Sequence, residues 1–298
     1  ARRAGGRGCV VSRRIRGRRV QSCFFDAVVY LFASLGIVVA VSLVAFLVMG
    51  AMPAFRQLGP SFIFKTHWSP QRGEYGVMAM LACSAVACCG AVVLALPLAL
   101  LGAACVKNLF PKRIKNVVRQ LGMVLCGLPS VIFGLLGLTV LMPWLLKVMP
   151  RQMAQSGGAS LFTVILVLAA MLLPNLFIGC LDSLEQAGER VDVASLALGA
   201  TVTQTVFCAE LPAVRRHIIK NGAAGIQRAL CEAMAVLLVS GNVVRMPEFF
   251  KSARLLASGM VLEMGYASGV HRGALFAIGL VLLAFALLSE RLLKRLDS

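Results

Sequence analysis

The chain has 298 residues, of which 59% are hydrophobic and only 14% are charged, against about a quarter in soluble domains. Together with a mean hydropathy of +0.86, this composition excludes an ordinary soluble protein and indicates an integral membrane protein. The net charge of +18 would suggest nucleic-acid binding in a soluble chain. Here the basic residues lie at the ends of apolar segments, so membrane topology explains them, and we expect membrane lipid and no nucleic acid as a partner.

The first 23 residues form a basic segment with eight arginines and no acidic residue. Such a segment could be a transit peptide, a nucleic-acid-binding arm or a cytoplasmic anchor. It leads directly into an apolar stretch and has no cleavage site of small residues, which disfavours a cleaved signal peptide. We therefore predict a basic cytoplasmic segment over 1–23, followed by a membrane domain over 24–298.

Six stretches of the chain are long and apolar enough to cross a bilayer core of about 30 Å. They lie near residues 25–50, 77–106, 117–146, 160–181, 222–244 and 273–291. The predicted fold is an all-α membrane protein with six transmembrane helices. Glycines in the stretch GLPSVIFGLLG, residues 127–137, permit close approach between helices.

Orientation follows from the Lys and Arg residues in the connections between the predicted spans. The N-terminus, the loops 107–119 and 182–221, and the C-terminus hold 20 of the 29 basic residues outside the spans. The loops 51–76, 147–159 and 245–272 hold the other nine. We therefore expect both termini to be cytoplasmic, with the protein in the bacterial inner membrane.

Metal and cofactor sites are not expected. The three histidines are far apart in the sequence, no CxxC pair occurs, and most of the ten cysteines lie inside apolar runs, where they suit packing. The sequence also shows no catalytic combination of Ser, His and Asp and no paired carboxylates, so we predict neither a catalytic site nor an enzyme.

The cytoplasmic connection 182–221 has too regular a pattern for a simple linker. Val193, Leu196 and Ala197 recur at helical spacing, Gly199 interrupts the pattern, and Pro212 ends it. This predicts a short helix along the cytoplasmic face of the membrane. The pattern alone fits a helix resting on lipid as well as one that docks to a protein partner.

Four acidic residues stand at the start of the same connection. No basic partner for them is recognisable in the sequence, which favours a solvated start of a helix. They are Asp182, Glu185, Glu189 and Asp192.

The predicted span 222–244 contains the charged residues Arg228 and Glu232 in the stretch QRALCEAMAV. A spacing of four residues places both side chains on one face of a helix, within reach of each other. At 1.5 Å per residue from Gly222, Arg228 lies roughly 9 Å and Glu232 roughly 15 Å into the span. Such charges are costly in hydrocarbon, so the pair is either part of an anion pathway or a structural ion pair between spans.

The loop 182–221 resembles that of the permease subunits of ATP-binding-cassette (ABC) importers. Their loop follows the pattern EAA, three residues, Gly, nine residues, Ile, any residue, Leu-Pro. The residues in this register are Val193, Ala194, Ser195, Gly199, Ala209, Leu211 and Pro212. Val193 replaces the glutamate and Ala209 replaces the isoleucine of the pattern.

Other stretches are similar to the C-type permease subunit of the phosphate-specific importers, in order and spacing from about residue 55 to 290. They are HWSP and EYG within 67–76, LPLALLGAA at 96–104, CGLPSVIFGLLGL at 126–138, ASLALGAT at 194–201, RALCEAMAVLLVSGN at 228–242, and the tail from LASGMVLEMGYASG onward. The family's RALGETMAV is RALCEAMAV here, with Cys231 for glycine and Ala233 for threonine.

This resemblance implies the type I permease architecture of ABC importers and a role in phosphate import. The implied partners are a paralogous A-type permease, a cytoplasmic ATPase dimer and an extracytoplasmic phosphate-binding protein. The chain has no GxxxxGK[ST] motif, so ATP must be hydrolysed by a partner. The resemblance also implies that the loop docks to the ATPase and that Arg228 and Glu232 serve transport. A permease for sulfate or molybdate, or a non-conducting scaffold or sensor subunit, remain alternatives.

Overall fold

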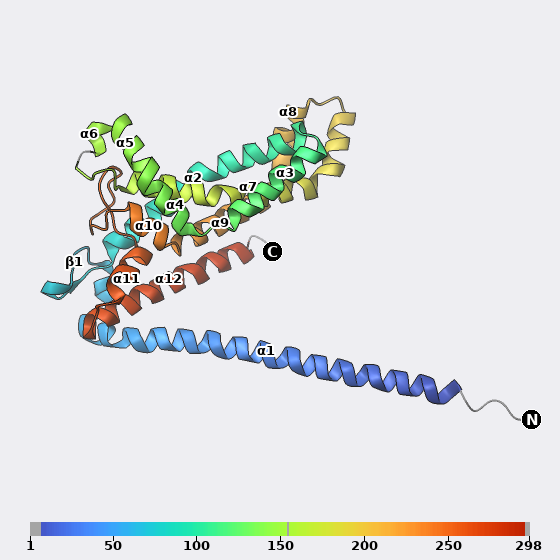
Figure 1. The fold of residues 1–298 in the computed structure, drawn as a ribbon, viewed down its shortest axis with the longest axis horizontal. Helices are drawn as coiled ribbons and strands as arrows, with labels where there is room; N and C mark the ends of the chain where they lie inside the picture. Colours follow the sequence, from blue (N-terminus) through green and yellow to red (C-terminus); the bar gives the residue numbers. More distant parts are fainter. Residues whose placement is uncertain (1–6, 154, 296–298) are drawn as a thin grey trace, which may run out of the picture. The chain divides into compact units, whose positions relative to one another are not determined.

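The computed structural model describes residues 7–153 and 155–295, and almost all of its elements are helices (Figure 1). The chain forms two compact units, residues 1–50 and 51–298. The first consists of most of helix α1, Arg7–Leu58, whose stretch Val28–Leu58 has the length and hydropathy of a membrane span. The predicted basic segment is therefore helical from Arg7 onward, and residues 1–6 lie outside the described residues.

The second unit holds the remaining elements. The longer helices are α2 (Met78–Leu109), α3 (Lys112–Cys126), α7 (Leu161–Ala197), α9 (Leu211–Leu230) and α12 (Gly269–Arg295). The shorter ones are α4 (Ser130–Leu136), α5 (Met142–Val148), α6 (Pro150–Met153), α8 (Val202–Gln204), α10 (Met234–Val239) and α11 (Leu256–Met264). Two π-helical turns, η3 (Gly137–Leu141) and η4 (Thr205–Glu210), and two 3₁₀ turns, η1 (Pro60–Phe64) and η2 (Pro70–Arg72), complete the helical elements. The strands β1 (Trp68–Ser69) and β2 (Glu74–Tyr75) pair antiparallel, with Trp68 opposite Tyr75.

Five helical stretches of the described chain are long and apolar enough to cross a membrane. They are Val28–Leu58, Met78–Leu109, Ser130–Val148, Leu161–Gln186 and Gly269–Arg291. The third begins at Ser130 and not near 117, because Pro129 has no N–H to donate to a continuing helix and its ring disfavours helical backbone at the residue before it.

The predicted span 222–244 is divided in the structure. Helix α9 ends at Leu230, three residues leave the helical path, and α10 starts at Met234. Ala229 and Ala235, on the two sides of the break, are both buried in the same apolar core. Tertiary packing of both pieces therefore outweighs the local preference for one uninterrupted helix.

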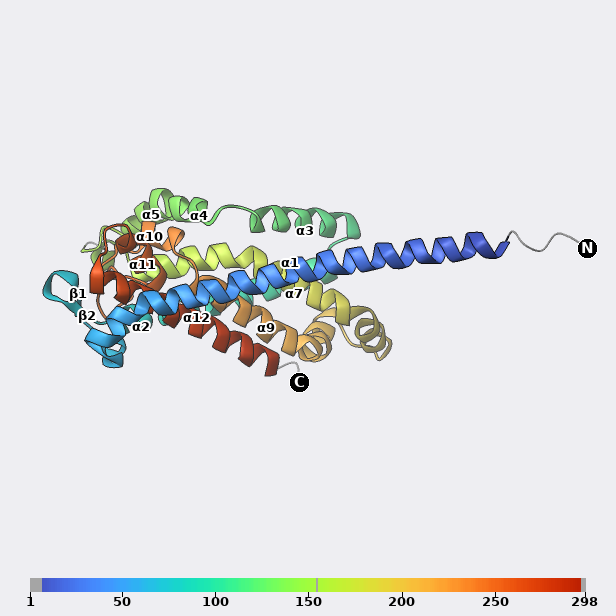
Figure 2. The ribbon, with the colours of Figure 1, turned by 90° about the horizontal axis from the view of Figure 1, so that it is seen from below.

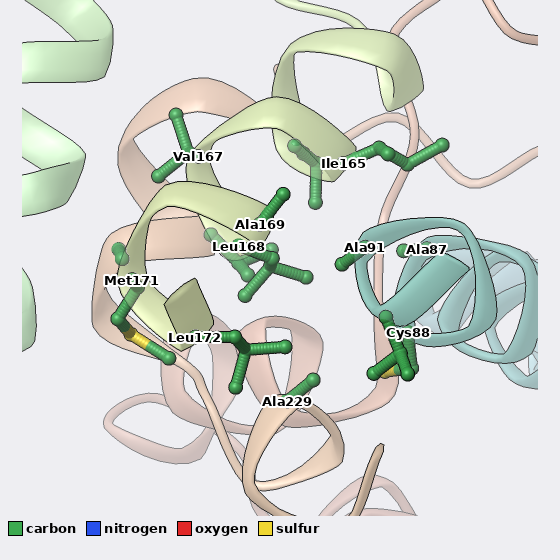
Figure 3. Packing of buried hydrophobic residues seen from close by; sticks show 14 of the residues in the cluster. Ala87, Cys88, Ala91, Ile165, Val167, Leu168, Ala169, Met171, Leu172 and Ala229 are labelled. Carbon is green, nitrogen blue, oxygen red and sulfur yellow. The ribbon is translucent and has the colours of Figure 1, made fainter. Parts of the chain in front are cut away.

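The core of the second unit forms where α2 packs along α7, the most extensive helix pair in the unit. Figure 3 shows small side chains of α2, such as Ala87, Cys88 and Ala91, facing the larger Ile165, Leu168 and Leu172 of α7. Small residues on one helix bring the two backbones close, and larger ones on the other fill the remaining space.

Glycines of the stretch 127–137 allow the close helix approach that the sequence predicts. A Cβ added to Gly134 in α4 would lie 2.7 Å from the Cα of Ala235 in α10. A Cβ on Gly137 would lie 2.6 Å from Val167 of α7 and 2.8 Å from Val239 of α10. The first contact is with backbone, which cannot move aside, so α10 can pack here only against a residue without a side chain.

The connections of the second unit gather at its two ends. At the end that we call the hairpin end, Trp68 of β1 meets Glu263 of α11, and the Leu161 N–H donates to the carbonyl of Lys251. At the other, the coupling end, residues of 107–119 form ion pairs with residues of 182–210. Figure 1 shows β1 and α11 far from α8, which lies at the coupling end, and Figure 2 shows β1 and β2 at the same end as α11. The loops predicted to share a side of the membrane are thus together.

Candidate functional site: a polar pocket in the spans and the coupling segment

A pocket of about 430 Å³ lies between α7 and α9. Its walls are apolar except for two asparagines, a glutamine and an arginine. The lining residues are Leu172, Asn175, Leu176, Asn221, Ala224, Gly225, Gln227, Arg228 and Cys231. Polar groups converging in a mostly apolar pocket are typical of ligand sites.

Arg228 stands in the last turn of α9, and its side chain is exposed on this chain. Within the described residues it makes no hydrogen bond and no ion pair. It shares the pocket with Asn175, which is about 21 Å along α7 from Leu161, near the middle of the candidate span Leu161–Gln186. The pocket therefore holds an unpaired guanidinium at the depth of the membrane interior, where it would favour an anion.

Glu232 is not on one helix face with Arg228, which corrects the predicted geometry. It lies in the break after α9, and its Oε1 accepts a hydrogen bond of 3.3 Å from the N–H of Ala235, in the first turn of α10. The carboxylate thus satisfies a free N–H at the positive end of α10. A spacing of four residues places two side chains on one face only if the helix continues, and here α9 ends at Leu230.

The two departures from the family's RALGETMAV lie in the same break. Cys231 has a φ of −82° and Ala233 a φ of −108°, which residues other than glycine adopt readily. Neither position therefore needs glycine for its backbone, and the exposed thiol of Cys231 becomes part of the pocket wall beside Arg228.

The predicted coupling segment begins as the end of α7 and not as a separate short helix. Figure 1 shows this yellow end of α7 turned across the direction of the rest of the helix. The carbonyl of Ala194 accepts from the N–H of Leu198, and that of Ser195 accepts from Ala200. Gly199 follows with a φ of +84°, so α7 ends in a Schellman motif, whose left-handed position favours glycine.

The remaining coupling residues lie on the other side of this turn. Ser195 and Thr205 share a hydrogen bond of 3.0 Å between their hydroxyls, which joins the end of α7 to η4. Leu211 and Pro212 begin α9 directly after the π turn. Since Pro212 has no N–H, it cannot complete the regular hydrogen-bond ladder, and the preceding turn widens into the π form.

The surface of the coupling segment is apolar and exposed. Leu198 has 89% of its surface accessible, Val193 has 69% and Phe207 has 54%. Leu196 and Val202 add to the same exposed set. An apolar surface around an ordered turn favours contact with a partner over a solvated loop.

Three of the four acidic residues at the start of the connection have basic partners, contrary to the prediction, and the side chain of Glu189 lies outside the described residues. Arg119 of α3 bridges Asp182 and Glu185 of α7, with 3.0 Å between its Nη2 and the Glu185 Oε2. These partners are more than 60 positions apart in sequence, so only the packing of α3 on α7 brings them together.

Asp192 belongs to a buried cluster that sequence analysis missed. The Nζ of Lys107, at the end of α2, lies 2.9 Å from Asp192 Oδ2 and 3.0 Å from Glu210 Oε2. Lys107 and Glu210 are almost completely buried. Gly188 makes room for the ammonium, because a Cβ there would lie 2.3 Å from it. Burial, together with the neighbouring carboxylate of Asp192, raises the pKa of Glu210 above its ordinary value, and Lys107 only partly offsets this.

A second buried cluster lies at the hairpin end, around Glu263 of α11. Its Oε2 accepts from Trp68 Nε1 at 2.9 Å and lies 2.7 Å from His271 Nε2. Its Oε1 accepts from the guanidinium of Arg254, whose Nε donates to the carbonyl of Asn242. One carboxylate thus joins the hairpin, the loop before α11, and α12.

Comparison with known proteins identifies a transport family. The sequence model of the family described as binding-protein-dependent transport system inner membrane component matches residues 91–298. A probable ABC transporter permease of Bacillus subtilis, YqgH, is 31% identical over 95% of this chain and 91% of its own length. The phosphate transport system permease protein PstC of Haemophilus influenzae is 27% identical over 87% of both chains.

Similar relations hold for two further proteins. PstC 2 of Mycobacterium tuberculosis, also named as a phosphate transport system permease, is 30% identical over 70% of both chains. A crystal structure of a bacterial ABC transporter involved in alginate import has the same fold, with a TM-score of 0.59 over 94% of this chain and 100% of that chain, at 15% identity.

Proposed function

Because the chain belongs to the family of binding-protein-dependent transport system inner membrane components, we propose that it forms half of a pathway for inorganic phosphate. It is a multi-pass permease subunit of an ABC transporter in the inner membrane, and it is not an enzyme. An importer of this family also contains an ATPase, a substrate-binding protein and a paired permease.

The observation that carries the proposal is Arg228 in the pocket between α7 and α9, which forms no ion pair with any described residue. A guanidinium stays charged at every physiological pH and can donate to two oxygens of a phosphate ion at once. In a low-dielectric region it offsets part of the cost of removing water from the anion. Glu232 places a negative charge four residues further along the chain, which opposes overly tight anion binding.

The paired permease would cover the side of the pocket that is open here. Arg228 and Cys231 are exposed on this chain although they lie within apolar segments. An exposed charge in such a segment needs either a protein partner or a water-filled path. A paralogous A-type subunit supplies both, because the path then lies between the two permeases.

The coupling segment is the proposed docking site for a cytoplasmic ATPase dimer. Its exposed apolar side chains surround the Schellman turn at Gly199 and are linked to η4 through Ser195. Since α9 follows η4 directly, movement of this segment would reach Arg228 through one helix. A phosphate-binding protein would deliver substrate at the hairpin end.

The proposed orientation places the coupling end and both termini in the cytoplasm, in line with the distribution of basic residues. Leu198 is 89% exposed at that end, so a single cysteine in its place, in a variant without other cysteines, is an accessible probe. We expect it to react with a membrane-impermeant thiol reagent in inverted vesicles and not in intact cells. Labelling in intact cells would reverse the orientation.

Uptake of labelled phosphate into vesicles that contain the whole complex tests the function. Arg228→Gln should lower uptake at least about tenfold, because one charged hydrogen bond contributes about 1.5–3 kcal/mol. Arg291→Gln, at an exposed position near the end of α12, is the matched control and should transport normally. Co-purification of the partner subunits confirms that each variant assembles.

Competing anions separate the alternatives. Excess sulfate or molybdate should leave phosphate uptake unchanged, and inhibition by either would assign the path to that oxyanion. A complex that hydrolyses ATP but moves none of these anions would indicate a scaffold or sensor subunit. Unchanged uptake in Arg228→Gln, at equal assembly, would remove Arg228 from the pathway.

A further inference from the structure

Two asparagines in the pocket have amide nitrogens without a strong acceptor among the described residues. Asn175 lies in α7 and Asn221 in α9; the buried Nδ2 of Asn175 has no hydrogen bond to a described residue, and Asn221 has only the thiol of Cys180 beside it. The thiol of Cys180 beside Asn221 is only a weak acceptor. Unsatisfied donors are costly in an apolar surrounding and are usually retained for a ligand, water or partner.

The two amides and the arginine lie one after another along the pair of helices α7 and α9. Asn221 precedes Arg228 by seven residues on α9, which places both on one face about 10 Å apart. Asn221 packs at the level of Gly179 on α7, and Asn175 lies one turn away from it toward Arg228. Because α9 starts at the coupling end, the order toward that end is Arg228, Asn175, Asn221.

Gly179 leaves room for the side-chain amide of Asn221. A Cβ at position 179 would lie 2.9 Å from Nδ2, 3.0 Å from Cγ and 3.1 Å from Oδ1 of Asn221. All three distances are shorter than ordinary contacts, so a larger residue would push the amide away. The terminal torsion of asparagine is broad, so each amide can reorient at the pocket wall.

We propose that Asn175 and Asn221 form a second, uncharged binding position for a tetrahedral oxyanion, on the coupling-end side of Arg228. It rests on the proposed function, since it takes the pocket as part of the anion path. The amides donate hydrogen bonds to the anion but carry no charge, so they hold it more weakly than the guanidinium. An anion that leaves Arg228 is thus kept partly dehydrated and is still released.

The test measures initial rates of labelled phosphate uptake by vesicles with the complete complex. Asn221→Ala and Asn175→Ala should each lower the rate about twofold to tenfold, the loss expected for a neutral hydrogen bond. Asn221→Asp should lower it further, because it removes the donors and places a carboxylate in the anion's way. Co-purification of the partners shows that each variant assembles.

Gly179→Ala displaces the Asn221 amide without removing it, and separates binding from packing. We expect its rate to fall to that of Asn221→Ala, and the double variant Gly179→Ala/Asn221→Ala to show the same rate. If Gly179 matters only for packing, the double variant will recover normal uptake, which overturns the proposal. Gly102→Ala is the control, because its Cβ would meet Phe177 at an ordinary 3.6 Å.

The outcome for Arg228→Gln distinguishes the two proposals. Uptake lost in Arg228→Gln but normal in Asn221→Ala and Asn175→Ala would overturn the asparagine position and leave the phosphate pathway intact. Normal uptake in Arg228→Gln would overturn the pathway and this inference together. Reduced uptake in all three variants, with normal Gly102→Ala, supports both.

Discussion

The two ends of the second unit each bury a charged cluster, but the clusters are balanced differently. At the hairpin end, the single carboxylate of Glu263 meets the guanidinium of Arg254, the imidazole of His271 and the indole N–H of Trp68. At the coupling end, the single ammonium of Lys107 meets two carboxylates, Asp192 and Glu210.

This difference indicates what each end is built to do. Glu263 has donors at both oxygens, and they come from three separate elements, so the cluster fixes those elements to one another. In the Lys107 cluster the negative charges exceed the positive, and buried oxygens of both carboxylates lack hydrogen bonds to described residues. Such an underpaired cluster is suited to rearrangement, which a segment that transmits movement requires.

The largest effect should come from Glu263→Ala. Removing one partner of a buried ion pair leaves Arg254 uncompensated, which costs about 3–5 kcal/mol. We expect a strongly lowered midpoint of thermal unfolding in detergent and a loss of assembled complex. Glu74→Ala, an exposed acid in β2 at the same end, should be close to wild type.

A nearly unchanged midpoint for Glu263→Ala would show that the hairpin-end cluster does not fix its elements. The two ends would then not differ in the way that their charges indicate.

Lys107→Met should be less damaging than Glu263→Ala. It leaves two carboxylates without a cation, but Glu210, whose pKa is already raised by burial, can bind a proton and relieve the repulsion. The expected loss is about 1–3 kcal/mol near neutral pH and smaller in acid. Unfolding midpoints of wild type and variant at acidic and neutral pH would measure it, and a loss that is greater in acid would contradict this interpretation.

Glu210→Gln should flatten the dependence of stability on pH. Since its pKa is raised in the folded chain, Glu210 binds its proton more tightly there than in the unfolded chain. Its contribution is complete below the ordinary pKa of about 4.3 and is lost as pH rises through the folded value. The variant should therefore gain stability over wild type as pH rises through that window. A constant difference between the two proteins across this pH range would argue against burial as the cause.

Gly199→Ala should have the smallest effect on stability. No atom lies within 4 Å of an added Cβ, so only the positive φ is strained, at about 1 kcal/mol. We expect the spans to remain folded while co-purification of the ATPase weakens. Gly265→Ala, which also has open space but a φ of −66°, should retain the ATPase. Equal recovery of the ATPase with both variants would place its docking elsewhere.

The length of the apolar stretches was enough to predict the helical membrane fold, and the spacing of Gly199 and Leu211-Pro212 predicted the family. The break at 231–233 was not predictable, because no proline or glycine marks it and only tertiary packing against α4 and α7 and capping by Glu232 favour it. The Lys107 cluster joins residues from three distant parts of the chain, so local patterns could not reveal it.

The asparagines of the pocket did leave a signal in the sequence. Asn175 is a lone amide inside the apolar run MLLPNLF, and Asn221 stands at the edge of GAAGI. An uncharged polar side chain in such a run is easily interpreted as one that the helix packing tolerates and that has no binding role. Only the pairing of α7 with α9 shows that both reach the same pocket as Arg228.

The π turn η4 sets the rotational phase of the helix that bears Arg228. An α helix advances by about 100° per residue, and a π turn holds roughly one residue more than an α turn. Rewinding Thr205–Glu210 into ordinary α helix would therefore rotate α9 by about 100° around its own axis. Both Arg228 and Asn221 would then leave the side of α9 that faces α7. A local change in winding beside Glu210 is therefore geometrically equivalent to turning the anion-binding face by more than a quarter of a revolution.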